Sequence, residues 1–203
     1  MPQIIEPPYK TMPTEGLPPL RWTVEQFVNL STMGLLPDGK YELINGEIVG
    51  KMPISKAHMI VHSLLISLLI RLYGAEFLIP PVSLRASNDS LPEPDLCVSR
   101  VSIHEMEAAG FLQPQEAHIV VEIAVSTLGN DLTTKARLYA QAGITEYWVV
   151  DVNSRRLLVH EAPSEGEYAT VTEYGESDTV IPQSASGRSF TVLEVLPAGL
   201  GDE

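Results

Sequence analysis

The chain has 203 residues, of which 13 are Lys or Arg and 26 are Asp or Glu, so its formal net charge is −13 at pH 7. That length accommodates one α/β or α+β domain with a complete core, and a 44% hydrophobic fraction excludes a disordered acidic chain. A single cysteine, Cys97, excludes an internal disulfide framework and a cysteine-built zinc cage, and it suits a reducing compartment. With no secretory leader pattern at the start, we expect a cytoplasmic protein.

The negative charge is unevenly distributed along the chain. Residues 151–203 hold ten acids and three bases, whereas residues 51–100 hold four acids and five bases. Affinity for nucleic acid depends mainly on neutralising phosphates, so a protein this acidic has no general attraction for it. A nucleic-acid partner would therefore have to bind a local basic surface.

The N-terminal third predicts an arm, a helix and a hairpin. Six prolines among the first twenty residues predict an extended arm over residues 1–20, followed by a single domain over residues 21–203. The capping-box sequence TVEQ at residues 23–26 predicts a short helix that ends near Met33. Asn-Gly between two apolar-rich arms predicts a β-hairpin over residues 41–49, because a type I′ turn needs two residues with positive φ.

Residues 56–73 form the most apolar stretch of the sequence. The stretch is short and is interrupted by His62, Ser63 and Ser67, which argues against a membrane span. We expect a helix buried on most of its circumference, against a sheet or across a dimer interface. Together with the arm, this surplus of apolar surface predicts a homodimer.

The rest of the chain predicts an α/β core followed by short strands. Four strands are expected, at residues 76–85, 94–99, 118–125 and 146–152. A helix from Asn130 to Ala142, with Gly143 as its C-terminal stop, lies between the third and fourth strands. The last fifty residues predict short strands separated by turns.

Two carboxylates lie on predicted apolar strands. Asp95 precedes a short apolar run, and Glu122 lies in the middle of a strand of β-branched residues. Ionised carboxylates buried in such surroundings cost several kcal/mol unless they are paired or bound to metal. A divalent cation would satisfy both acids, whereas a salt bridge or an exposed position at a sheet edge is the structural alternative.

Lys135 lies on the helix that follows the Glu122 strand. It shares a helical face with Leu132 and Tyr139, so we expect its side chain to lie beside apolar neighbours and to reach the end of that strand. The alternative is a weak surface pair with Asp131, four residues earlier.

The hairpin contributes two further acids. A two-residue turn places Glu42 and Glu47 diagonally on one face, about 7–8 Å apart at the backbone. They form either a solvated face or the source of a third acid for a metal site.

Several other residues have structural and functional alternatives. His58 and His62 have the spacing of two zinc ligands on a helix, but the Glu of a His-Glu-x-x-His motif is missing, so a packed or hydrogen-bonding pair is the alternative. Cys97 is expected to be a small buried hydrophobe. Tyr147 and Trp148 are expected to pack in the core, with base stacking as the alternative.

Six motifs occur in one order along the chain: YELINGE at 41–47, Met52-Pro53 with His58, PEPD at 92–95, VVEI at 120–123, NDLTTK at 130–135 with Tyr139, and AGITEYW at 142–148. This ordered set resembles the Uma-two family of restriction-endonuclease-like proteins, within the PD-(D/E)XK nuclease superfamily. The resemblance covers about residues 22–152 and leaves C-terminal β elements over residues 153–203.

The resemblance implies a restriction-endonuclease-like α-β-β-β-α-β core with a central mixed sheet, an N-terminal hairpin and C-terminal strands. It also implies metal-dependent hydrolysis of phosphodiester bonds in nucleic acid. Asp95, Glu122 and the backbone carbonyl of Ile123 would hold Mg²⁺ or Mn²⁺. Glu47 would match the acidic position ahead of the core, where it could tune the metal or accept a proton.

The sequence departs from the superfamily pattern at one catalytic position. The lysine expected two residues after the second acid is replaced by Ala124, and Lys135 resembles the relocated lysine that this family places on the following helix. There it would orient a water or stabilise developing charge. Residues 125–128 also lack the family's usual Ser-Pro pair. The alternative function is a non-catalytic, dimeric binding or scaffold protein that retains the fold.

Overall fold

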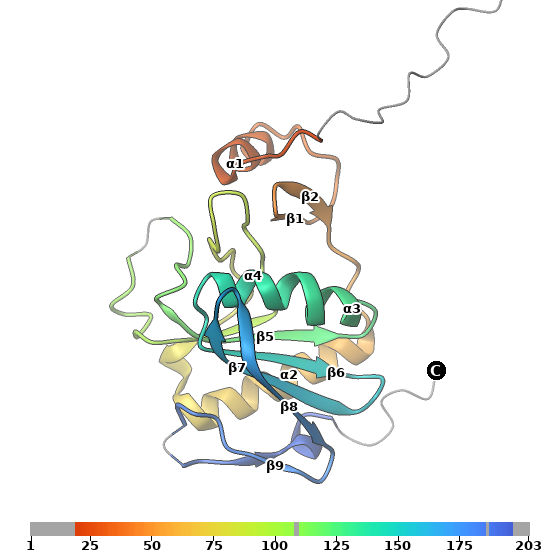
Figure 1. Cartoon of the computed structure of the whole chain (residues 1–203), viewed down its shortest axis with the longest axis vertical. Helices are drawn as coiled ribbons and strands as arrows, with labels where there is room; N and C mark the ends of the chain where they lie inside the picture. The colour runs from red at the N-terminus through yellow and green to blue at the C-terminus, as the bar shows by residue number, and fades with distance from the viewer. Residues whose placement is uncertain (1–18, 108–109, 186, 197–203) are drawn as a thin grey trace, which may run out of the picture.

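In the computed structural model of the protein, residues 19–107, 110–185 and 187–196 are described, so the expected arm over residues 1–20 lies outside them apart from its last two residues. A six-stranded mixed sheet forms the centre of the molecule, with strand order β3-β4-β5-β6-β7-β8 (Figure 1). Only β5 and β6 are parallel; the other neighbours in this sheet are antiparallel. The strands are β3 (Leu78–Ile79), β4 (Leu96–Ser99), β5 (Ala117–Ala124), β6 (Glu146–Asp151), β7 (Arg156–Ser164) and β8 (Glu167–Gly175).

Helices cover both faces of this sheet. Helix α2 (Lys56–Tyr73) packs on one face, and a helical stretch over residues 128–141 crosses the other (Figure 1). The central strand β5 is therefore buried on both sides, with Ile119, Val121 and Ile123 in the α2 cluster. Val120 and Ala124 belong to the opposite cluster. Because side chains alternate along a strand, Glu122 faces the same layer as Val120 and Ala124. The expected order helix, strand, strand, strand, helix, strand is confirmed.

The helical stretch over residues 128–141 is interrupted by a π-helical turn. It consists of α3 (Leu128–Asn130), the π turn (Asp131–Lys135) and α4 (Ala136–Gln141), where the sequence predicted one continuous helix. The backbone carbonyl of Asp131 accepts a hydrogen bond of 3.1 Å from the Tyr147 hydroxyl. Insertions of this kind occur often at functional sites. Here the π turn carries both Asp131 and Lys135.

Helix α2 has the predicted bounds and is buried on one side. Its buried residues lie along one side that packs on the sheet: Val61, Leu65, Leu68, Leu69 and Leu72. Met59 and Ile70 are exposed, so the sheet alone does not cover the whole helix, and burial across a dimer interface stays a prediction. By length and hydropathy alone the helix could cross a membrane, but its packing against the sheet accounts for its apolar composition.

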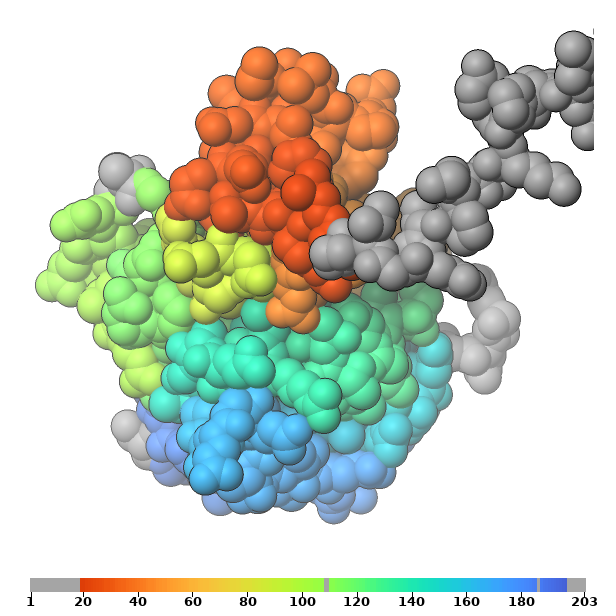
Figure 2. Space-filling model, turned by 45° about the horizontal axis from the view of Figure 1, so that its top comes forward, coloured from red at the N-terminus to blue at the C-terminus, as the bar shows by residue number. Residues whose placement is uncertain are grey.

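The N-terminal elements form a smaller layer over one end of the core. Helix α1 (Val24–Thr32) begins with the predicted capping box, and strands β1 (Tyr41–Ile44) and β2 (Glu47–Gly50) form the predicted hairpin. At its turn, Asn45 and Gly46 have φ of 49° and 75°, as a type I′ turn requires. Figure 2 shows this layer, in red to orange, standing against the yellow loop that precedes β4. Within it, Leu91 donates a backbone hydrogen bond of 2.7 Å to Leu43, which ties the loop to the hairpin.

The strand expected over residues 76–85 is much shorter than predicted. A 3₁₀ helix occupies Ala75–Phe77, and only the two residues of β3 pair with β4. Pro80 and Pro81 follow at once, and proline has no N–H to donate to a neighbouring strand.

The C-terminal segment completes the central sheet. Strands β7 and β8 are nine residues each and extend the sheet beyond β6, which is a longer pairing than the sequence predicted. Strands β9 (Thr179–Val180) and β10 (Phe190–Thr191) form a separate ribbon, and a 3₁₀ helix follows at Val192–Glu194. Phe190 and Val192 close the α2 side of the core.

Candidate active site

A cavity of about 210 Å³ lies where the hairpin, the segment that links it to α2, and the ends of β4 and β5 meet. Five carboxylate side chains and three lysines line it: Glu42, Glu93, Asp95, Glu122 and Asp131, with Lys40, Lys51 and Lys135. The acids come from β1, from the segment before β4, from β5 and from the π turn. Such a concentration of titratable groups in one recess is typical of a catalytic site.

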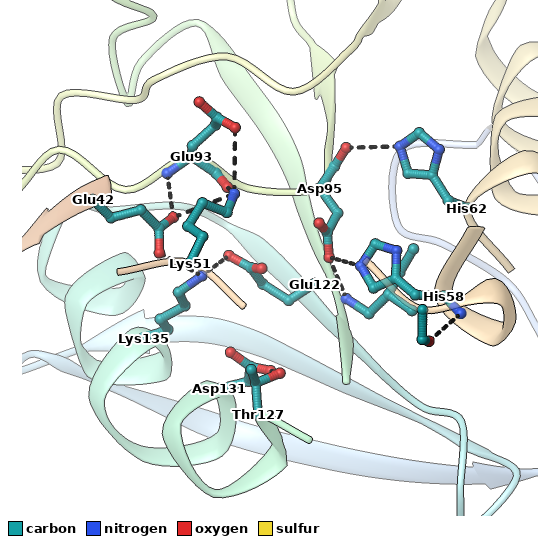
Figure 3. A network of polar contacts seen from close by, with 12 residues as sticks. Glu42, Lys51, His58, His62, Glu93, Asp95, Glu122, Thr127, Asp131 and Lys135 are labelled. Atoms are coloured by element: carbon teal, nitrogen blue, oxygen red, sulfur yellow. Dashed lines mark hydrogen bonds and ion pairs between the residues drawn. The ribbon is translucent and has the colours of Figure 1, made fainter. Parts of the chain in front are cut away.

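Glu122 and Lys135 form a buried ion pair at the base of the cavity (Figure 3). The Lys135 Nζ lies 2.8 Å from Glu122 Oε1, and the Tyr139 hydroxyl donates to the same oxygen at 2.8 Å. Glu122 is 4% exposed and Lys135 is 6% exposed. Lys135 therefore reaches the end of strand β5 as the sequence predicted, and its partners are acids of other elements, not Asp131.

Glu42, not Glu47, is the hairpin acid that enters this cluster. Glu42 Oε2 lies 3.5 Å from Lys135 Nζ, and its Oε1 accepts a 2.6 Å hydrogen bond from the Glu93 backbone N–H. Glu47 instead pairs with Arg21 at 2.7 Å beside the turn and remains well exposed. The two acids share a face of the hairpin, as the register predicted. Of the two, only Glu42 lines the cavity.

Lys51 bridges the hairpin to the segment before β4. Its Nζ donates 2.8 Å and 3.3 Å hydrogen bonds to the Glu93 backbone carbonyl and to Glu93 Oε1. It also lies 3.8 Å from Glu42 Oε1 (Figure 3). Glu42 thus lies between two ammonium groups, which fixes the position of its carboxylate.

Asp95 is held from two directions at the start of strand β4. Its Oδ2 accepts a 2.8 Å hydrogen bond from the Ile123 backbone N–H and lies 3.1 Å from His58 Nε2. His62 Nε2 donates to the Asp95 carbonyl oxygen at 3.2 Å. Continuing the β4–β5 register by one residue places Asp95 opposite Glu122. The two histidines of α2 therefore serve one aspartate, and their zinc-like spacing has a hydrogen-bonding explanation.

The acids of the cavity differ in their tendency to ionise. Burial raises the pKa of Glu122 to about 8, against the lowering effect of Lys135, and the surrounding acids add to the rise. Burial also raises the pKa of Asp131, although Thr127 donates a hydrogen bond to its carboxylate. For Asp95 burial acts in the same direction, but hydrogen bonds from His58 and the Ile123 N–H hold its pKa below the ordinary value.

Lys135 keeps its charge in this environment. Burial disfavours the ammonium form, but the neighbouring carboxylates of Glu122 and Glu42 outweigh it and raise the pKa of Lys135. The site thus combines one ionised aspartate, one permanent cation and a glutamate that exchanges its proton near neutral pH.

The donor set of Asp95, Glu122 and the Ile123 carbonyl fits a hard divalent cation. Among the described residues, no group of three or more His, Cys, Asp or Glu side chains is placed to hold a metal. Mg²⁺ does not need such a group, because it commonly binds through one or two carboxylates and keeps several waters. Burial and, to a smaller extent, the neighbouring acids raise the pKa of Glu122, and a bound cation would favour its ionised form, which is the second reason for the fit.

Sequence reasoning identified the central residues of the site and missed part of its support. Asp95, Glu122, Lys135 and the Ile123 backbone are brought together around the cavity, and Glu47 is not. Lys51 and Glu93 were not singled out, although Glu93 lies within the PEPD motif. Their contact joins elements 42 residues apart, so no local spacing could reveal it.

A mixed sheet with this order, flanked by α2 and α4 and carrying acids and a lysine at its central strand ends, defines the restriction-endonuclease-like class of α/β folds. Within that class the chain belongs to the Uma2 family, described as "Putative restriction endonuclease", whose model matches residues 24–195. The match continues past residue 152, so β7 and β8 belong to the family domain.

A solved structure supports the fold independently. A protein from Anabaena variabilis ATCC 29413, described as "a putative nuclease belonging to DUF820", is similar with a TM-score of 0.64 and 17% sequence identity. The similarity covers 86% of this chain and 97% of that one. No curated protein matches the chain.

Proposed function

We propose that this protein is a nuclease that hydrolyses phosphodiester bonds with the help of Mg²⁺ or Mn²⁺. The observation that carries the proposal is that Asp95 and the buried Glu122–Lys135 pair converge on one cavity in a nuclease fold. Family membership supports the same class of reaction.

Asp95, Glu122 and the Ile123 carbonyl would hold the metal ion. When bound, such an ion acidifies a water and neutralises charge on the phosphoryl oxygens in the transition state. Asp95 is already ionised, because His58 and the Ile123 N–H stabilise its carboxylate. Glu122 has a raised pKa and releases its proton to become a ligand, so binding should strengthen as pH rises toward 8.

Lys135 supplies positive charge where the reaction develops negative charge. Its ammonium reaches Glu122 from the helix layer, the position from which it can orient a water or stabilise a phosphoryl oxygen. Glu42 acts through Lys135 as a positioning residue, since it contacts the ammonium from the side opposite the strand. Tyr139 fixes the orientation of the Glu122 carboxylate through its hydroxyl.

The test is a cleavage assay on single-stranded and double-stranded DNA and RNA with Mg²⁺, Mn²⁺ or a chelator. We expect metal-dependent cleavage that falls by at least about 100-fold in Glu122→Gln. Glu167→Gln is the matched control, because Glu167 is an exposed glutamate on strand β8 that pairs with Arg137 of α4. Cleavage that persists in the chelator, or that is equal in both variants, would contradict the proposal.

One observation favours the alternative of a non-catalytic binding or scaffold protein. The Lys135 ammonium lies 2.8 Å from Glu122 Oε1, so this acid already has a cationic partner without a metal. A folded protein that cleaves none of the four substrates with either metal would favour this alternative. In either case we propose a cytoplasmic homodimer that does not bind a membrane: Cys97 is a free buried thiol, one side of α2 packs in the core, and the exposed Met59 and Ile70 on α2 are available to a second copy.

A further inference from the structure

The mouth of the cavity differs in character from its base. Three apolar residues line it and are exposed to solvent: Val49 at 42%, Met52 at 67% and Ile54 at 68%. They lie on β2 and on the segment that connects it to α2, on the hairpin side of the acid cluster. Exposed apolar side chains grouped at the entrance of a polar recess are a surface that a ligand covers.

The cations that remain available for a ligand lie at the same mouth. The arginines of the described residues contact carboxylates or backbone carbonyls, as Arg21 does with Glu47 and Arg100 with Ala117. Lys51 and Lys135 are bound to acids inside the cavity. In residues 19–107, 110–185 and 187–196, Lys40 and Lys56 are the exposed lysines for which the structure gives no such contact. Lys40 lines the cavity, and Lys56 directly follows Ser55, which also lines it.

Two free lysines beside an apolar rim match an unpaired nucleotide strand better than a duplex. A duplex binder typically neutralises six to ten phosphates, which the described surface of this acidic chain does not provide. A single strand needs fewer contacts, and its unpaired bases can lie against apolar side chains.

The size and depth of the cavity also favour a single strand over a duplex as the ligand. The cavity has a volume of about 210 Å³. Glu42, Glu122, Asp131 and Lys135 are almost fully buried, whereas Asp95 is partly accessible. A duplex is stiff over about 150 base pairs, so bringing one of its phosphates into such a recess requires an unfavourable bend. A single strand can bend at each nucleotide and bring one phosphate to the base.

We infer that the substrate of this site is single-stranded nucleic acid, with its backbone phosphates at Lys40 and Lys56 and its bases against Val49, Met52 and Ile54. The inference that this strand is cleaved rests on the proposed nuclease function. The inference that the strand binds at this surface does not. It names a strand-binding surface of five residues outside the acid cluster.

Binding is measured first, with a 20-nucleotide DNA of mixed sequence and with its duplex, in Ca²⁺ over a range of salt concentrations. We expect the single strand to bind more tightly than the duplex. In Lys40→Gln/Lys56→Gln, the slope of log K against log salt should fall by about 1.4, because each phosphate contact on a single strand contributes about 0.7. Arg137→Gln is the control, since Arg137 is an exposed cation on α4 away from this cavity.

The apolar rim is tested separately. Met52→Ser/Ile54→Ser should weaken single-strand binding about tenfold, whereas Ile181→Ser, which changes an exposed isoleucine elsewhere, should not. Cleavage with Mn²⁺ should favour the single strand by at least about 100-fold, because a duplex must bend unfavourably to bring a phosphate to the acids at the base.

The outcomes separate the two proposals. Equal or faster cleavage of the duplex overturns the inference and leaves the nuclease proposal standing. Tight single-strand binding without cleavage supports the inference and overturns the nuclease proposal. If the rim variant converts a dimer to a monomer in sedimentation while strand binding is unchanged, the rim is a contact between two copies and the inference is wrong.

Discussion

Lys135 and Glu122 are joined by a 2.8 Å contact between Nζ and Oε1 in a part of the core where both are nearly inaccessible to solvent. Neither charge would be stable there alone, because removing one partner of a buried pair leaves the other without compensation. The pair is therefore a requirement of the fold as well as a feature of the candidate site.

Replacing Lys135 tests both roles. Lys135→Met should lower the cleavage rate by about 100-fold with little change in metal affinity, because the ammonium acts on the transition state. It should also lower the free energy of unfolding by about 3–5 kcal/mol at pH 9, where the wild-type protein has the ionised pair and the variant loses it. At pH 6 the loss should be smaller, since Glu122 is then protonated. Kinetics and denaturant unfolding at both pH values measure this.

A lysine restored at the superfamily position should recover part of that activity. Ala124 lies two residues after Glu122 on the same face of β5, so Ala124→Lys would project beside the carboxylate. The double variant Lys135→Met/Ala124→Lys should therefore cleave faster than Lys135→Met. Undiminished cleavage in Lys135→Met itself would show that this lysine is purely structural.

Metal binding depends mainly on Asp95. Asp95→Asn should abolish the heat of Mg²⁺ or Mn²⁺ binding at millimolar concentrations in calorimetry, because the amide cannot replace an ionised ligand. Asp178→Asn is a suitable comparison: Asp178 accepts a hydrogen bond from the Gly175 N–H at the far side of the molecule. Heat that is the same in both variants would place the metal elsewhere.

The two hairpin acids provide a matched pair of variants. Glu42→Gln should reduce cleavage by roughly tenfold to 100-fold, because it loosens Lys135 and removes a charge partner of Lys51. Glu47→Gln removes an exposed pair with Arg21, and its effect on stability should be below about 1 kcal/mol. A larger loss of activity in Glu47→Gln than in Glu42→Gln would restore the role that the sequence motif suggested for Glu47.

The core order of the fold could be predicted from the sequence because each element has a local signal. The capping box of α1, the Asn-Gly turn and the β-branched run of β5 are all defined by neighbours in the chain. The length of β3 was overestimated because Pro80 and Pro81, a local signal that ends a strand, were not taken into account. Composition alone does not show how many layers cover α2.

The candidate site was predictable only in its ligand positions. Asp95 and Glu122 stand out because carboxylates are rare on apolar strands. The choice between Glu42 and Glu47 was not predictable, because both share one hairpin face and only tertiary packing decides which end meets the cavity. The roles of Lys51 and His58 depend on contacts across 42 and 37 residues.

A pH dependence of stability is expected from Glu146, which lies apart from the candidate site. This residue on β6 is 1% exposed, and the Trp148 indole N–H donates to its Oε1 at 2.8 Å. Burial raises the pKa of Glu146 to about 7 from an ordinary value of 4.5. Since the unfolded chain ionises first, stability should fall as pH rises from about 4.5 to 7 and then level off.

Glu146→Gln should remove that loss. The amide oxygen can still accept from Trp148, and the variant has no proton to release on unfolding. Its melting temperature should exceed that of the wild type at pH 8 and match it at pH 4.5, as measured by calorimetry. An identical pH profile in both proteins would show that folding does not raise the pKa of Glu146.

The π turn at Asp131–Lys135 makes the site sensitive to the number of residues as well as to their identity. In an α-helix each residue rotates the chain by about 100° around the axis. Deleting the exposed Thr133 would allow an unbroken α-helix. The helical residues before position 133 would then be rotated by that angle relative to the residues after it. If α4 kept its packing on the sheet, Asp131 would rotate away from the cavity. A family member could thus lose or gain this geometry through a one-codon deletion or insertion, with every site residue still present in its sequence.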